Sequence, residues 1–229
     1  HRNGLQPPSS IGAAFDDVEL SVLITDRMLD RVLSDVAGWK RDGREVGRIA
    51  INAATADFRR GDLAERILEK VTRLGLTASV LELEVTESVL VGQMAGRVGQ
   101  TLTKLRDAGV TIALDDFGTG YASLTHLQQF PVDVLKIDRS FIDKVSTDTM
   151  GSSAVVDALL QMAKAMGITS VAEGIETIAQ AEYLVTRGCD LGQGYLFGRP
   201  VGRNRVLPLL DDGVGFAARP RPASAMPRY

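Results

Sequence analysis

Apolar side chains recur along this chain in two alternating rhythms, one helical and one typical of strands. Between residues 20 and 41 they return every three or four positions, which predicts an amphipathic helix closed by Gly43. The same spacing predicts longer helices over 62–74, 96–108, 152–166 and 178–187, and a short helix after Arg203. The intervening short apolar runs predict six strands, over residues 48–52, 80–85, 111–114, 132–137, 168–172 and 190–196.

Strands that alternate with helices in this way predict an α/β fold with a parallel sheet and right-handed crossovers. No internal repeat or linker divides the chain, so we expect one domain over residues 1–212. Residues 213–229 are rich in Pro and Ala and are expected to be a disordered tail.

Composition and charge narrow the classes of protein that this chain can represent. Apolar residues make up 45% and charged residues 24%, as in an ordinary globular chain. The net charge of −3 argues against binding to nucleic-acid polymers or to an anionic membrane surface. No apolar run approaches the roughly 18 residues of a membrane helix, and Cys189 is the one cysteine, so a reducing, cytoplasmic setting is expected.

Histidine is scarce, which limits the chemistry available for hydrolysis. The two histidines are His1 and His126. A Ser-His-Asp triad or a histidine-rich zinc site is therefore poorly supplied, and hydrolysis by this chain would have to use carboxylates.

Polar residues stand at or just past the carboxyl end of each predicted strand. In chain order they are Asn52, Glu84, Asp115, Lys136, Glu173 and Gln193. All strand ends of a parallel barrel open onto one face, where catalytic groups from several strands meet. An open doubly wound sheet would instead gather its ligands at a single switch point. Six contributing strand ends therefore favour a barrel mouth.

The chemistry of this set points to metal-assisted hydrolysis. Asn52, Glu84 and Asp115 offer three oxygen ligands suited to Mg²⁺ or Mn²⁺, and Asp116 adds a carboxylate for a second cation. Lys136 supplies a positive charge for a phosphoryl oxygen or for the attacking water. Glu173 is a candidate general base, and Glu176 lies three residues further on.

Each of these residues also has a structural explanation when it is taken alone. A strand-end carboxylate is more often a helix N-cap or a turn residue, and a lone lysine at a strand is more often a snorkelling surface residue. Residues 115–121 could be a simple turn, although their glycines also suit an amide-rich loop that closes over an anion. The functional interpretation rests on six strand ends that share one chemistry.

Five segments resemble the EAL-domain family, in the family's order and spacing, within a resemblance that runs from about residue 4 to residue 201. They are ELEVTES at 82–88, LDDFGTGY at 114–121, LKIDRSF at 135–141, VAEGIET at 171–177 and QGYLFGRP at 193–200. The resemblance implies a bacterial phosphodiesterase of cyclic di-GMP. It also implies a modified TIM (β/α) barrel, of which this chain contains six strands.

The resemblance also implies a role for individual residues. The family's metal ligands fall on Asn52, Glu84 and Asp115, with Asp116 serving the second cation, while Lys136 matches the lysine that holds the nucleophilic water and Glu173 the general base. The supporting residues that it implies for the substrate or the loop are Glu87, Glu176, Asp138, Gln193 and Tyr195. Glu87 is expected to steady the loop at 115–121, and that loop and the following helix are expected to form a homodimer contact.

Two departures from the family pattern stand out. No Glu-Ala-Leu triplet occurs in the chain, and residues 1–8 resemble the loop that follows the strand carrying it. The expectation is an N-terminally incomplete domain that lacks the family's first two strands and belongs to a longer protein, such as a sensor. Asn52-Ala53-Ala54 also stands where the family usually has Asn-Leu-Ser, although the asparagine ligand is kept.

The leading hypothesis is a cytoplasmic, metal-dependent enzyme that hydrolyses cyclic di-GMP to linear pGpG. The alternative is a catalytically inactive receptor that binds cyclic di-GMP without cleaving it. A scaffolding barrel with a vestigial ligand set is the third possibility, and it predicts no nucleotide binding.

Overall fold

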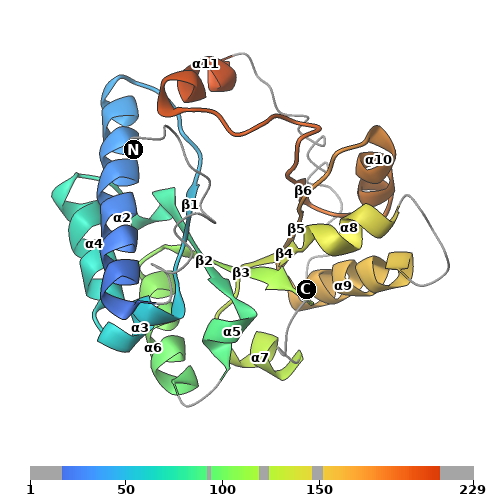
Figure 1. Cartoon of the computed structure of the whole chain (residues 1–229), viewed down its shortest axis with the longest axis horizontal. Helices are drawn as coiled ribbons and strands as arrows, with labels where there is room; N and C mark the ends of the chain where they lie inside the picture. The colour runs from blue at the N-terminus through green and yellow to red at the C-terminus, as the bar shows by residue number, and fades with distance from the viewer. Residues whose placement is uncertain (1–16, 92–93, 119–123, 146–151, 212–229) are drawn as a thin grey trace, which may run out of the picture. The chain divides into compact units, whose positions relative to one another are not determined.

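The computed structural model describes residues 17–91, 94–118, 124–145 and 152–211. The chain divides into two compact units, residues 1–134 and residues 135–229, with the division inside strand β4. Figure 1 labels the helices and strands of both units. The expected limits of the domain and of its tail stay a prediction, and the tail lies outside the described residues.

Unit 1 is built on three adjacent parallel strands, which are β1 (Ile49–Asn52), β2 (Leu81–Thr86) and β3 (Thr111–Phe117). The central strand β2 is buried along most of its length, as expected where helices cover a parallel sheet. Its register pairs Asn52 with Glu84 on one side and Thr86 with Asp115 on the other. This register aligns the polar carboxyl ends of the three strands.

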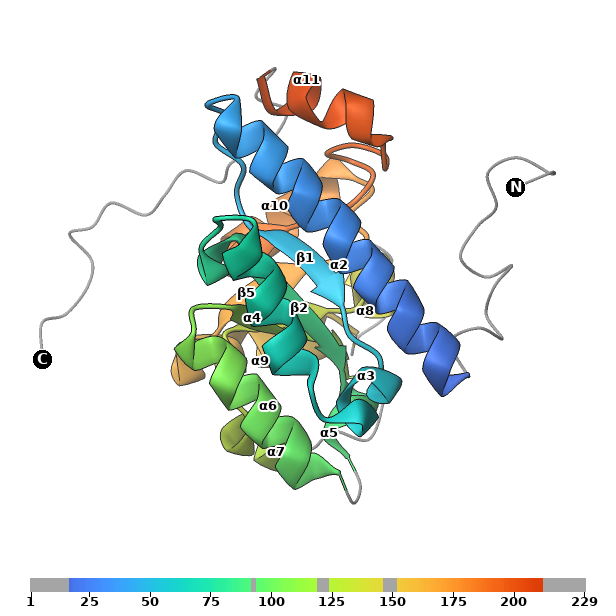
Figure 2. The same ribbon diagram turned by 90° about the vertical axis from the view of Figure 1, so that its left-hand side faces the viewer.

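Helices accompany this sheet in unit 1. They are α2 (Val18–Arg41), α3 (Thr55–Arg60), α4 (Leu63–Arg73), α5 (Glu87–Leu90), α6 (Ala95–Asp107) and α7 (Leu124–Gln129), with a 3₁₀ turn, η2 (Ala78–Val80), before β2, and α2, α5 and α6 contact the strands of the sheet. Figure 2 shows α4 between α2 and α6, which it contacts on either side. Leu29 and Leu33 of α2 and Ile67 of α4 are fully buried in this layer. The helical spacing in the sequence therefore identifies the buried faces.

Unit 2 begins within β4 (Val134–Ile137) and carries β5 (Thr169–Ala172) and β6 (Leu191–Gly192). β5 pairs in parallel with β6. The helices are α8 (Arg139–Val145), α9 (Ser152–Met166), α10 (Ile178–Thr186) and α11 (Val206–Asp211), with the 3₁₀ turn η3 (Arg203–Arg205) before α11. The core of this unit joins Ile137, Ile142, Leu160, Ala172 and Leu184, from both strands and helices.

The structure departs most from the expected strand bounds at β3 and β6. β3 extends to Phe117 rather than Leu114, because its pairing with β2 continues as far as Asp115. β6 is only Leu191–Gly192, whereas residues 190–196 were expected. The strand stops because residues 194–197 form a turn, in which the Phe197 N–H donates to the Gly194 carbonyl oxygen (3.1 Å). Within the described ranges, no helix has the length and apolar character needed to cross a membrane.

Candidate active site

Three predicted metal ligands share one face of the sheet in unit 1. Asn52 ends β1 and lies directly opposite Glu84 of β2, and neighbouring strands are spaced about 4.8 Å apart. Ala113 of β3 pairs with Glu84, and Asp115 stands two residues further along the same strand. Because side chains alternate between the faces of a strand, Asp115 faces the same side as Glu84. Three oxygen-bearing side chains therefore converge at the carboxyl edge of the sheet.

The environments of these side chains differ in ways that matter for cation binding. Glu84 is buried, Asp115 is half-buried, and Asn52 and Asp116 are exposed. Asp115 and Asp116 each offer a carboxylate oxygen within 4.8 Å of the other. The Asp116 N–H donates to Asp115 Oδ1 (3.0 Å), which orients the first carboxylate.

Asp116 adopts a backbone conformation that is uncommon for residues other than glycine. Its φ is +55°, and among the described residues it is the one non-glycine residue with a positive φ. Side chains other than glycine enter this left-handed region at an energetic cost, and such residues cluster at functional sites. The strain lies at the point where the predicted second ligand follows the first.

Glu87 supports the end of β3 in unit 1. It is the buried first residue of α5, and its Oε1 accepts a hydrogen bond from the Gly118 N–H (2.7 Å). This contact holds the start of the segment that the sequence analysis assigns to a loop over the substrate. The rest of that loop, residues 119–121, lies outside the described residues.

In unit 2 the structure brings Lys136 and Glu173 together. Lys136 Nζ lies 2.7 Å from Glu173 Oε1, and the two side chains are only 6% and 18% exposed. The Glu173 N–H donates to the Ile137 carbonyl oxygen (3.0 Å), which fixes the residue after β5 against β4. A buried ion pair of this kind makes removal of either partner costly, because the other charge would remain buried and unpaired.

The proposed supporting residues of unit 2 differ in whether their backbone or their side chain makes the contacts. The backbone of Gln193 accepts from Ile175 N–H (3.0 Å) and donates to Ala172 (2.8 Å), which places Gln193 beside the segment that carries Glu173. Glu176 is paired with Arg139 (2.9 Å). Asp138 caps the start of α8, with its Oδ1 accepting from Ser140 N–H (2.9 Å). This last contact gives Asp138 a structural function at the start of the helix.

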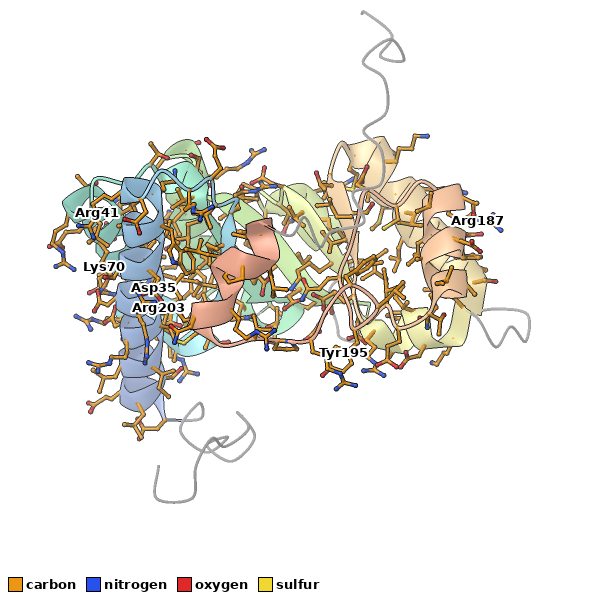
Figure 3. All side chains as sticks on the ribbon, turned by 90° about the horizontal axis from the view of Figure 1, so that it is seen from above. Asp35, Arg41, Lys70, Arg187, Tyr195 and Arg203 are labelled. Atoms are coloured by element: carbon orange, nitrogen blue, oxygen red, sulfur yellow. The ribbon has the colours of Figure 1, made fainter. Side chains whose placement is uncertain are left out.

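Tyr195 is half exposed on unit 2, at a position labelled in Figure 3. The Arg199 guanidinium lies over its ring, 4.6 Å from the ring centroid. A cation above an aromatic face is attracted to it, by about 0.5–1 kcal/mol at an exposed site. The tyrosine therefore presents a partly exposed ring beside a guanidinium group.

Cys189 offers no support for a thiol-based hydrolase. Burial raises the pKa of its thiol, and hydrogen bonds that involve Ser170 and Leu191 oppose the shift without reversing it. A thiol with a raised pKa holds little of the nucleophilic thiolate.

Sequence reasoning missed Arg139. It lies within the segment LKIDRSF, but a single arginine at a helix start has no periodicity or spacing that would distinguish it from a surface residue. Its significance comes from Glu176, far along the chain.

The chain belongs to the EAL domain family, which its sequence matches over residues 1–200. Its fold is the modified TIM barrel of that family, an α/β fold with six parallel strands in this chain. The resemblance identified from the five sequence segments is confirmed.

Particular relatives connect the family to cyclic di-GMP. The chain is 37% identical over 197 residues to the cyclic di-GMP phosphodiesterase NbdA of Pseudomonas aeruginosa, covering 86% of this chain and 25% of NbdA. A solved structure of the PaMucR phosphodiesterase in complex with c-di-GMP superposes with a TM-score of 0.81 at 35% identity, covering 88% of this chain and 81% of that one. Klebsiella pneumoniae BlrP1, solved as a manganese and cy-diGMP complex, has a TM-score of 0.73 at 28% identity, covering 84% and 48%.

The chain spans between about a fifth and a third of the length of the curated relatives it matches. The donor set of unit 1 fits the metal dependence of the family. Its side chains offer carboxylate and amide oxygens, the ligands that Mg²⁺ and Mn²⁺ prefer. The roles of the individual side chains stay predictions.

Proposed function

We propose that this chain is a metal-dependent phosphodiesterase that hydrolyses cyclic di-GMP to linear pGpG. The observation that carries the proposal is the buried pair of Lys136 and Glu173, whose Nζ and Oε1 atoms are 2.7 Å apart. The neighbouring positive charge favours the ionised carboxylate, and this is the form that can accept a proton from water. Binding a nucleotide without cleaving it needs no such pair, so the proposal favours an enzyme over a receptor.

In this proposal Glu173 is the general base. Its carboxylate accepts the proton of the attacking water, and the Lys136 ammonium stabilises the negative charge that the base needs. Lys136 also provides N–H donors for the oxygen of that water or for a phosphoryl oxygen. The backbone bond from Glu173 to Ile137 (3.0 Å) keeps the base in place while the proton moves.

Asn52, Glu84 and Asp115 would hold Mg²⁺ or Mn²⁺, and Asp116 would serve a second cation. Bound cations of this type lower the pKa of water and polarise a phosphoryl oxygen. The shared face of Asn52 and Glu84 supports this assignment, as does the short separation of the Asp115 and Asp116 oxygens. The manganese complex of the Klebsiella relative supports the choice of cation.

The remaining site residues are proposed to support the substrate or the loop. Glu87 would hold the loop after Asp116 through its bond to Gly118. Gln193 and Tyr195 would line the substrate from the segment after β6, while Glu176 and Asp138 would act through the backbone around them. A cytoplasmic location, and a homodimer formed through the loop and helix after Asp116, complete the proposal.

The test is to incubate the protein with cyclic di-GMP and Mg²⁺ or Mn²⁺, to separate the products by chromatography, and to measure nucleotide binding by calorimetry. Formation of pGpG supports the enzyme. Tight binding without pGpG would instead identify a receptor, and the absence of both would contradict any role in binding cyclic di-GMP.

A further inference from the structure

Arg139 connects the start of α8 to the segment that follows β5. Its side chain is half exposed, and its guanidinium spans two carboxylates: Nε lies 3.0 Å from Asp143 Oδ2, and Nη2 lies 2.9 Å from Glu176 Oε1. Asp143 lies one turn along the same helix, whereas Glu176 belongs to residues 173–176. The pair with Asp143 therefore fixes the guanidinium that holds Glu176.

The stem of Arg139 lies directly against Gly174, the residue after Glu173. A Cβ atom on Gly174 would lie 2.3 Å from Arg139 Cγ and 2.6 Å from Arg139 Cβ. Gly174 also has a φ of +72°, a conformation that residues with a side chain rarely adopt. The arginine stem thus occupies the space that a side chain at position 174 would need.

The same segment is held on its other side by backbone contacts. The Glu173 N–H donates to Ile137 (3.0 Å), and the Ile175 N–H donates to Gln193 (3.0 Å). A Cβ on Gly194 would lie only 2.1 Å from the Ile175 carbonyl oxygen, so these two chain segments touch through their backbones. Residues 173–176 are therefore enclosed between the segment after β6 and the Arg139 side chain.

We propose that Arg139 is a positioning residue, which fixes the backbone of residues 173–176 so that the Glu173 carboxylate stays at Lys136. The proposal rests on the proposed function, in which Glu173 is the base. A misplacement of about 1 Å can cost an enzyme about 10²-fold in rate. Exposed ion pairs contribute little to global stability, so loss of Arg139 should affect the base more than the fold.

The experiment compares Arg139→Ala and Arg139→Lys with Arg187→Ala. Arg187 is a matched control, because it is 51% exposed where Arg139 is 50%, and it pairs with Asp157 (3.1 Å) in the same unit (Figure 3). The measurements are kcat and KM for cyclic di-GMP, the melting temperature, and hydrogen exchange of the Glu173 and Ile175 amides by NMR.

We expect Arg139→Ala to lower kcat by about 10–100-fold with little change in KM. Amide exchange at Glu173 and Ile175 should become faster, while the melting temperature stays close to that of the parent. Arg139→Lys keeps the stem and one charge, and should recover most of the rate. Arg187→Ala should match the parent in both kcat and exchange.

Unchanged exchange in Arg139→Ala would overturn the proposal, and so would faster exchange with an unchanged kcat. An equal loss of kcat in Arg187→Ala would also overturn it, because the effect would not be specific to Arg139. The exchange comparison needs no turnover. A parent protein that hydrolyses no cyclic di-GMP would therefore contradict the proposed function, while the exchange data would still test the position of Glu173.

Discussion

At the scale of single residues, Glu173 separates chemistry from binding. Glu173→Gln preserves the shape of the side chain but removes the proton acceptor. General-base catalysis is typically worth about 10²–10⁴-fold, so kcat should fall by that factor while the affinity for cyclic di-GMP changes little. Steady-state kinetics and calorimetry on the same preparation measure the two quantities.

The control for this variant is Glu182→Gln, which neutralises an exposed glutamate on α10 of the same unit. It should leave kcat unchanged. A Glu173→Gln protein that hydrolyses cyclic di-GMP at the parent rate would remove Glu173 from its role, and Glu176 would become the next candidate for the base.

Gly194 gives a second prediction at this scale. A Cβ at this position would lie 2.1 Å from the carbonyl oxygen of Ile175 and 2.2 Å from its nitrogen, and backbone cannot move aside as a flexible side chain can. Overpacking typically costs about 1–3 kcal/mol, so Gly194→Ala should lower the free energy of unfolding by at least this amount.

Gly198→Ala is the matched comparison, because a Cβ there would meet nothing within 4 Å. Chemical denaturation of both variants measures the difference. Equal stabilities for the two alanine variants would show that the contact between residues 175 and 194 does not restrict the fold.

At the scale of elements, the buried carboxyl group of Asp57 near the N-terminus of α3 makes the stability of the fold depend on pH. Burial raises the pKa of Asp57, outweighing hydrogen bonds from the Ala54 N–H (2.9 Å) and the Thr25 hydroxyl (3.0 Å). A raised pKa means that the folded state holds this proton more tightly than the unfolded state. The contribution of Asp57 to stability is therefore greatest below its ordinary pKa of 3.8 and declines as the pH rises through the raised value.

Asp57→Asn does not ionise, and its amide oxygen can still accept both hydrogen bonds. Relative to this variant, the parent should become progressively less stable as the pH rises from about 3.8 towards neutrality. Urea denaturation of both proteins at several pH values measures the difference. If the difference in the free energy of unfolding between the two proteins did not vary with pH, that result would contradict a raised pKa for Asp57.

Elements also show how far the sequence alone could predict this structure. The long helices were predictable because burial repeats every three to four residues, and the strands of the site were predictable because short apolar runs mark buried strands such as β2 and β4. The helices α5 and α8 span only 4 and 7 residues, too few for a helical repeat to show. β6 stops at the turn over residues 194–197, and Gly194 in that turn meets Ile175, nineteen positions earlier in the chain, a contact that local pattern cannot reveal. The role of Arg139 could not be predicted either, because its partner Glu176 is distant in the sequence.

At the scale of the whole molecule, each unit carries residues with a different proposed role. The oxygen donors Asn52, Glu84 and Asp115 belong to unit 1, whereas Lys136 and Glu173 belong to unit 2. The proposed reaction needs both groups, so changes in either unit should lower turnover, but in different ways. The turnover rate of a variant at a proposed metal ligand in unit 1 should depend on the cation concentration differently from the parent. The turnover rate of a variant at Glu173 should keep the cation dependence of the parent.

Asp115→Asn tests this distinction, because it alters a proposed metal ligand while keeping one oxygen donor. The variant should need a higher Mg²⁺ concentration for half-maximal activity, and excess Mg²⁺ should recover part of the rate. Glu173→Gln should show the Mg²⁺ dependence of the parent at a much lower maximum. Identical Mg²⁺ dependence for Asp115→Asn and the parent would exclude Asp115 as a ligand.

The most direct test of the central claim is the rate of pGpG formation from cyclic di-GMP as Mg²⁺ is titrated into the metal-free protein. We expect no pGpG in the presence of EDTA, and a rate that rises with added Mg²⁺ and then saturates. No pGpG at any concentration of Mg²⁺ or Mn²⁺ would contradict the claim that this chain is a cyclic di-GMP phosphodiesterase.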